Sequence, residues 1–99
     1  MIVEITNYYA KPEQADAVLE QRRRACAIRV RLGLAVGRIF TRIEGPGPDV
    51  RWECEFATRV EYEQDMAVRA SSAEFAAARE AMHLLLERFE RQLQRNVHA

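Results

Sequence analysis

The sequence has few of the residues that build metal centres and disulfide frameworks. It contains only two cysteines, Cys26 and Cys54, without a C-x-x-C spacing, and only two histidines. No cluster of His, Cys, Asp and Glu has the spacing of metal ligands, so a protein-built metal site is not expected. Both cysteines lie in apolar-patterned segments, which predicts two buried, reduced thiols rather than a disulfide. We expect neither a metal nor a cofactor.

Long apolar runs and an excess of one charge are also missing. No apolar run approaches the roughly 20 residues that span a bilayer, and the first residues lack the pattern of a signal peptide. The formal net charge is zero, from 15 basic and 15 acidic residues, so no overall field attracts nucleic acid or an anionic membrane. We interpret the arginine runs within residues 22–24 and 88–95 as solvated helix faces or ion-paired rims. These absences predict a cytoplasmic protein with no nucleic-acid or membrane partner.

The glycine-rich and nucleophile motifs of common enzyme classes are missing as well. The chain has no GxGxxG, P-loop or nucleophile elbow. Its densest glycine segment, residues 45–48, is interrupted by prolines, which remove the N–H donors that a phosphate cradle needs. What the chain does have is 48% hydrophobic and 30% charged residues in 99 positions, which is typical of one globular domain over residues 1–99.

The alternation in residues 2–9 predicts a β-strand with both faces in use. We expect one face to supply the core through Val3, Ile5, Asn7 and Tyr9. The opposite face carries a carboxylate, a hydroxyl and a phenol, because its residues are Ile2, Glu4, Thr6 and Tyr8. This polar strand face is the first candidate for a functional surface.

Start and stop signals predict the next elements. The first helix has a proline-led start and a glycine stop, and its apolar stripe has Arg22 and Arg29 at the edges. A turn rich in proline and glycine joins the next two strands. Capping boxes at Thr58 and Ser71 open two more helices. The predicted elements cover residues 12–32 (helix), 34–44 and 50–57 (strands), 60–70 (helix) and 73 onward (helix).

The last segment is ambiguous from its periodicity. The apolar stripe of the helix from residue 73 extends to Phe89, and Leu93 and Val97 continue its spacing, but residues 89–97 also alternate like a half-polar strand. The order is therefore β-α-β-β-α with an open choice at the end, and a final strand would make the α+β fold ferredoxin-like. The helices can cover only one sheet face, so we expect a second copy to cover the other in a symmetric homodimer.

Several short stretches resemble the dimeric α+β barrel superfamily, most closely its NIPSNAP-like branch. Members of that branch open with a strand of the form I-Y-E-L-R-T-Y followed by K-P-G, and residues 2–8 and 11–13 here are I-V-E-I-T-N-Y and K-P-E. The branch also has an aromatic-rich third strand, an acid-aromatic helix start and a basic last strand, as in residues 52–56, 74–75 and 91–97.

The chain departs from the branch at three places. Thr6 stands where the branch usually has arginine, Glu13 where it has glycine, and Cys54 where an aromatic residue is common. If that arginine is important for a ligand in the branch, there are two possibilities. This protein binds a different ligand, or Arg38 or Arg42 from the neighbouring strand takes the place of the missing arginine.

The resemblance implies a ferredoxin-like β-α-β-β-α-β arrangement with an antiparallel four-stranded sheet and a last strand over about residues 90–97. Two such sheets, one from each subunit, would face each other as a dimeric α+β barrel with the helices outside. Members of the superfamily include cofactor-independent monooxygenases, lactone isomerases, aldoxime dehydratases and haem-handling enzymes. The fold alone therefore does not select a reaction.

The side chains assigned to the faces away from the helices form the candidate site. In the functional interpretation, Glu4 and Tyr8 are an acid–base pair, and Tyr8 and Phe40 are walls of a cavity inside the barrel. The candidate ligand-binding residues, which include arginines that could orient a carboxylate or an oxyanion, are Thr6, Arg38, Phe40 and Arg42. In the alternative interpretation these charges only satisfy one another in an ion-paired interior or on a polar surface.

His83 is a further catalytic candidate, because histidine titrates near neutral pH. It lies between Met82 and Leu84, beside the apolar stripe of the last predicted helix, so a partly buried structural histidine is the other interpretation. Haem ligation through His83 is a third. His98 lies in the tail, where we expect disorder.

We therefore expect a NIPSNAP-like dimeric α+β barrel that binds a small hydrophobic or aromatic molecule in the barrel, and either releases it unchanged or transforms it without a metal. The alternative is a non-catalytic homodimeric assembly module whose barrel is filled by its own side chains. A nucleic-acid binder is disfavoured by the zero net charge.

Overall fold

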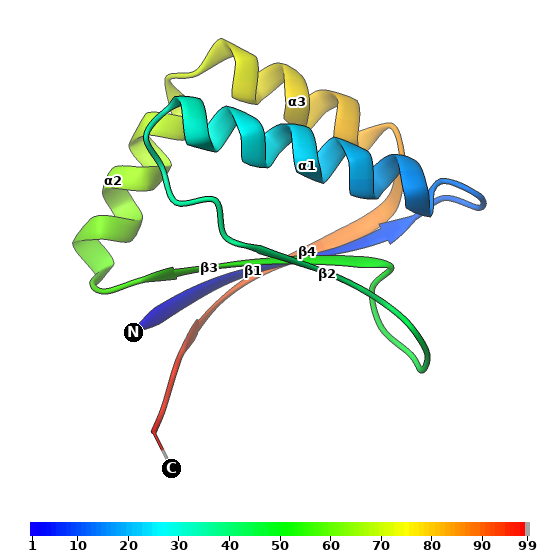
Figure 1. Cartoon of the computed structure of the whole chain (residues 1–99), viewed down its shortest axis with the longest axis horizontal. Helices are drawn as coiled ribbons and strands as arrows, with labels where there is room; N and C mark the ends of the chain where they lie inside the picture. The colour runs from blue at the N-terminus through cyan, green and yellow to red at the C-terminus, as the bar shows by residue number, and fades with distance from the viewer. Residues whose placement is uncertain (99) are drawn as a thin grey trace.

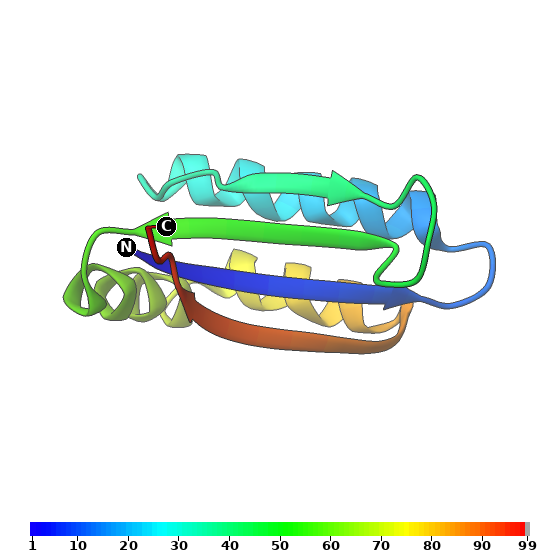
Figure 2. The same cartoon turned by 90° about the horizontal axis from the view of Figure 1, so that it is seen from below.

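The computed structural model describes residues 1–98 as a four-stranded sheet with the three helices packed on one face (Figure 1). The strands lie in the order β2-β3-β1-β4, and each neighbouring pair is antiparallel. Seen from below, the strands lie in front and the helices behind them (Figure 2). The elements are β1 (Ile2–Ala10), α1 (Ala15–Arg31), β2 (Arg38–Thr41), β3 (Val50–Phe56), α2 (Arg59–Ala70), α3 (Ala73–His83) and β4 (Leu86–Arg95).

The ferredoxin-like fold class is confirmed, and the ambiguous C-terminal segment is a strand. The expectation that the last helical stripe continues to Phe89 is wrong, because α3 ends at His83 and Leu86 already belongs to β4. Phe89 lies opposite Tyr8 of β1 in the sheet register. The four-residue spacing of the tail is therefore coincidental, since β4 is held by pairing with β1 along its length.

The helix caps explain where α2 and α3 begin. Thr58 caps α2 as predicted, its hydroxyl accepting a hydrogen bond from the Glu61 N–H at 3.2 Å. The second cap lies one residue later than predicted, because Ser72 rather than Ser71 accepts from the Phe75 N–H, at 3.1 Å. None of the helices within residues 1–98 is long and apolar enough to cross a membrane.

Two other predicted elements are longer than the observed ones. The helix predicted from residue 12 begins at Ala15, after Glu13, which adopts a positive φ of 67° that is incompatible with a helix. The strand predicted over residues 34–44 is reduced to the four residues of β2.

β1 alternates as predicted, but its faces are reversed. Glu4 lies opposite Cys54 of β3, and Thr6 lies opposite Trp52. Directly opposed residues share one face of a sheet, and Cys54 and Trp52 belong to the core. The side chains that face the helices are therefore those of Ile2, Glu4, Thr6 and Tyr8. The open face receives Val3, Ile5, Asn7 and Tyr9, the reverse of the prediction.

The core under the helices is centred on Trp52, which is 1% exposed. Its indole Nε1 donates a hydrogen bond to the Val36 carbonyl at 3.0 Å, which ties the segment between α1 and β2 to the ring. Gly37 has a φ of 76°, and a Cβ there would lie 2.4 Å from the indole nitrogen, so only glycine fits. Cys26 and Cys54 are buried free thiols, as predicted.

The open face of the sheet carries charges that pair both between β2 and β3 and along β3. Glu53 accepts from Arg38 at 2.9 Å and from Arg51 at 2.7 Å. Arg38 also approaches Glu55 at 3.5 Å. The two contacts of Arg38 join β2 to β3, whereas Arg51 and Glu53 are both on β3.

Candidate functional site

A cavity of about 410 Å³ lies between the helix-facing side of the sheet and the three helices. The larger apolar side chains of its wall are Trp52, Met66, Phe75, Met82 and Phe89. Its uncharged polar side chains are Thr6, Tyr8 and Gln21. Its basic side chains are Arg22, Arg69, Arg79, His83 and Arg91. Within residues 1–98, no aspartate or glutamate lines the cavity, so the charged side chains of its wall are all basic.

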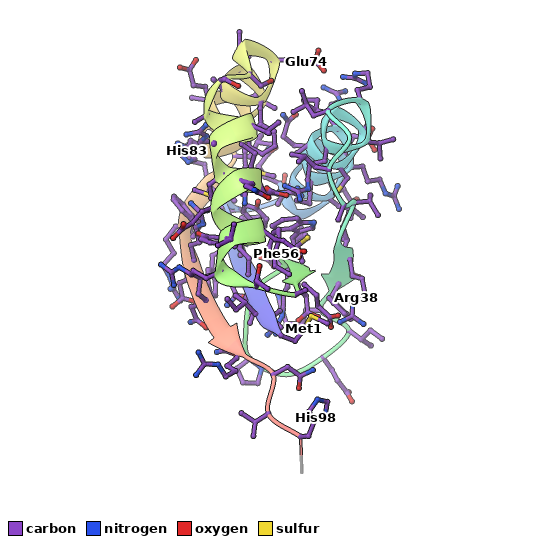
Figure 3. All side chains as sticks on the ribbon, turned by 90° about the vertical axis from the view of Figure 1, so that its left-hand side faces the viewer. Met1, Arg38, Phe56, Glu74, His83 and His98 are labelled. Carbon is purple, nitrogen blue, oxygen red and sulfur yellow. The ribbon has the colours of Figure 1, made fainter. Side chains whose placement is uncertain are left out.

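One end of the cavity is deep and the other is open. Buried lining residues mark the deep end and include Tyr8, Arg22, Trp52 and Met82. Exposed ones mark the mouth and include Arg79, His83, Phe89 and Arg91. The rings of His83 and Phe89 stack there with centroids 5.2 Å apart, and His83 lies at the outer edge of α3 (Figure 3). The mouth therefore opens between the end of α3 and β4.

Arg22 occupies the deep end and is 5% exposed. Its Nη1 donates to the Tyr8 hydroxyl at 3.1 Å, and its guanidinium carbon lies 4.2 Å from the centre of the Trp52 ring. Its other two nitrogens, Nε and Nη2, are buried without an acceptor among residues 1–98. No carboxylate in that part of the chain pairs with it. Arg22 is thus a buried cation whose charge the described residues leave uncompensated.

Glu4 lies behind the cavity wall and is fully engaged. It is 1% exposed; Arg69 of α2 donates to both carboxylate oxygens at 2.6 and 3.0 Å, and Arg91 of β4 donates to one at 3.0 Å. Asp65 lies 2.8 Å from the other side of Arg69. Burial by itself would lower the pKa of Arg69, but the hydrogen bonds and charges of Glu4 and Asp65 outweigh it and raise that pKa.

These ion pairs give the physical reason for the reversed faces of β1. Apolarity alone favours Val3 and Ile5 as the core side of the strand. A buried carboxylate is tolerated when it is paired and hydrogen-bonded, and two guanidinium groups meet that condition for Glu4.

A second buried ion pair lies near the C-terminal end of α1. Arg29 is 0% exposed and donates to both oxygens of Asp65, at 2.7 and 3.0 Å. Its Nε donates to the Ala35 carbonyl at 2.6 Å, and its guanidinium lies 4.9 Å from the centre of Trp52. Trp52 therefore contacts two arginines of α1, of which only Arg29 has a carboxylate partner.

The structure gathers only part of the predicted site. Thr6, Tyr8 and His83 line the cavity, while Glu4 lies behind it. The predicted ligand-binding residues that lie elsewhere are Arg38, Phe40 and Arg42. Arg38 and Phe40 lie on the open face of β2, and Arg42 lies past its end, paired with Asp49 at 2.8 Å.

The most important residues that the sequence reasoning missed are Arg22, Trp52, Arg69 and Arg91. The sequence did contain an indication that Arg22 is buried, because it follows the helical spacing of Val18, Ala25 and Cys26, all of which are buried. The sequence contained no indication of the roles of Arg69 and Arg91, because these residues meet Glu4 across 65 and 87 residues of chain.

The Cys54 thiol is not poised as a nucleophile. Burial raises the pKa of Cys54 against the opposing charge of Arg29, so the neutral thiol is favoured. In the described part of the chain, no group of three or more His, Cys, Asp and Glu side chains could hold a metal ion.

Comparison with known proteins supports the fold. No family model and no curated protein matches this chain. A NIPSNAP family protein from Agrobacterium tumefaciens has a similar structure, with 21% identity, a TM-score of 0.79, and coverage of 97% of this chain and 92% of that one. An antibiotic biosynthesis monooxygenase matches with 19% identity and a TM-score of 0.72, over 99% and 100% of the two chains.

A third solved structure is described as a dimeric protein of unknown function with a ferredoxin-like fold, from Bacteroides fragilis. It matches with 13% identity and a TM-score of 0.70, over 94% of this chain and 93% of that one. The chain therefore shares the ferredoxin-like fold of these solved structures, which include NIPSNAP proteins, in agreement with the resemblance seen in the sequence.

Proposed function

We propose that this protein binds a small molecule with an apolar or aromatic body in the cavity between the helices and the sheet. The observation that carries the proposal is the cavity itself, whose volume of about 410 Å³ lies in the range of small-molecule sites. Trp52 and Met82 supply apolar surface at its buried end, and Tyr8 and Thr6 supply hydroxyl groups that can orient a ligand. The proposed site thus lies on the helix side of the sheet, whereas the sequence suggested the open face.

Catalysis in this cavity is the finer part of the proposal. The Tyr8 hydroxyl accepts a hydrogen bond from Arg22, which leaves its own proton free to be donated to a ligand. His83 at the mouth is a second group that could exchange a proton with the ligand. Glu4 receives a positioning role in place of a direct one, because Arg69 and Arg91 occupy its oxygens.

The second candidate function is assembly through the open face of the sheet. This proposal is supported by the dimeric neighbour with a ferredoxin-like fold and by two features of the face. Phe40 is 45% exposed there, and the Asn7 Oδ1 is buried without a hydrogen-bond partner among residues 1–98. A second copy would cover the ring and could supply a donor to the amide oxygen. Sedimentation equilibrium should give twice the chain mass of 11.4 kDa, and a monomer at all concentrations would refute this assembly.

Binding in the cavity is tested with the matched variants Ala25→Leu and Ala27→Leu. Ala25 is buried on α1 and lines the cavity, whereas Ala27 is exposed on the same helix. Small aromatic and hydrophobic acids, amides and ketones are titrated against the fluorescence of Trp52, the only tryptophan and a lining residue. A leucine at position 25 fills space that the ligand needs, so affinity should fall about tenfold or more, while Ala27→Leu should bind like the wild type.

Two outcomes would refute the proposal. One is that no compound in the panel binds the wild-type protein. The other is that compounds bind, but the Ala25→Leu and Ala27→Leu variants retain the same affinity as the wild type. In the second case the ligand occupies another surface, such as the open sheet face.

A further inference from the structure

We infer, on the basis of the proposed cavity function, that the ligand carries a carboxylate group and that Arg22 binds it. The first support is the charge of the cavity wall. Four arginines and one histidine line it, and no acidic side chain of residues 1–98 does. A wall of this kind attracts an anion and disfavours a cation.

Two of these arginines are already paired with carboxylates. Arg69 and Arg91 share Glu4, and Arg69 also meets Asp65. Arg79 is exposed at the mouth, where water solvates it. Arg22 alone is both buried, with 5% of its surface exposed, and without a carboxylate partner in the described chain.

The two unused donors of Arg22 suit a carboxylate. Nε and Nη2 lie on the same edge of the planar guanidinium, and this edge can donate two parallel hydrogen bonds to the two oxygens of a carboxylate. In the structure both atoms are buried without an acceptor. Buried donors and charges are unfavourable until they are paired, so an anion reaching this edge is bound more strongly than a neutral group.

The surroundings of Arg22 hold the guanidinium in place for this role. Its Nη1 is occupied by the Tyr8 hydroxyl at 3.1 Å, and its plane is supported by the Trp52 ring at 4.2 Å. Because Nε and Nη2 are buried in the structure, the side chain must turn toward the cavity that it lines for this edge to meet the ligand. The apolar wall formed by Phe75 and Met82 then takes the ligand's body. The ligand class is a small aryl or alkyl carboxylic acid in its ionised form.

The experiment uses matched pairs of a carboxylate and its carboxamide, such as phenylacetate and phenylacetamide, at neutral pH. Wild-type protein, Arg22→Met and Arg22→Lys are compared, with Arg23→Met as the control because Arg23 is exposed on the same helix. Affinities are measured by calorimetric titration. Arg22→Met removes an uncompensated buried charge, so the variant should fold at least as well as the wild type.

In the wild type and in Arg23→Met, the carboxylate should bind on the order of tenfold or more tightly than the carboxamide. The preference should disappear in Arg22→Met, because the carboxylate loses more affinity than the carboxamide when the guanidinium is removed. Arg22→Lys keeps the positive charge but loses the planar edge with two donors. This variant should therefore retain part of the preference for the carboxylate.

Equal affinity of acid and amide for the wild type would overturn the role of Arg22 and leave the proposed cavity function standing. A preference that survives in Arg22→Met would also overturn it. Binding of neither member of any pair would remove the proposed function together with this ligand class.

Discussion

Gly37 should be the least replaceable glycine in the chain, and replacing it tests how Trp52 is held. Its φ of 76° lies in the left-handed region, which costs a residue with a Cβ about 1–2 kcal/mol. A Cβ at this position would also fall 2.4 Å from the Trp52 Nε1 and 2.6 Å from the Glu53 carbonyl oxygen. Relieving this overlap should cost about 1–3 kcal/mol, and displacing the indole from the Val36 carbonyl about 1 kcal/mol more. Gly37→Ala should therefore lose about 4 kcal/mol of unfolding free energy.

Gly33 provides a matched control for the backbone part of this cost. It has the same φ of 76°, but a Cβ there would meet no atom within 4 Å. Gly33→Ala should therefore lose only the conformational cost of about 1–2 kcal/mol. Urea denaturation of both variants, followed by Trp52 fluorescence at one protein concentration, gives the two free energies by linear extrapolation. Equal losses in the two variants would refute the close approach of Gly37 to the indole.

Two further substitutions probe the buried charges and the hairpin. Glu4→Gln should lower the unfolding free energy by about 3–5 kcal/mol in urea denaturation, because Arg69 loses a buried ion partner; a loss below about 1 kcal/mol would contradict this. Asp49 accepts a hydrogen bond from the Ala10 N–H and pairs with Arg42, which together hold the pKa of its carboxyl below the ordinary 3.8. Its contribution to stability is therefore present above about pH 4 and is lost as the pH falls through the lower folded pKa. Asp49→Asn should be less stable than the wild type at neutral pH, with a gap that closes in acid; a constant gap would contradict the assignment.

Much of the fold follows from local signals in the sequence. Thr58 caps α2 where the capping box predicts it, because the cap is an interaction between residues three apart. The turn at residues 45–49 and the alternation of β3 likewise depend on residues that are close to one another in the sequence. The last strand did not follow from its own pattern, since the spacing of residues 89–97 slightly favoured a helix, and only the family resemblance favoured the strand.

The site was less predictable, because long-range pairing decides it. Alternation separates the two faces of β1 but does not say which face meets the helices. Apolarity favoured Val3 and Ile5, whereas the structure turns Glu4 inward, where Arg69 and Arg91 neutralise it from 65 and 87 residues away. This reversal carries Thr6 and Tyr8 to the helix side and leaves Arg38 and Phe40 on the open one.

For Arg22, two sequence features lead to opposite predictions of its burial. Its position on the helical stripe with Val18 and Cys26 indicates burial, yet a charged residue in a run of three arginines is more often a solvated one. The feature that distinguishes Arg22 is that no carboxylate of residues 1–98 pairs with it. That feature appears only once the surrounding helices and strands are assembled.

The most direct test of this account is a crystal structure of the protein with the tightest-binding compound from the ligand panel. The account predicts ligand density between α1, α3 and the sheet, with its carboxylate oxygens about 2.7–2.9 Å from the Arg22 nitrogens and its body against Trp52. Density on the open face instead, over Val3 and Ile5 or between two facing sheets, would contradict it.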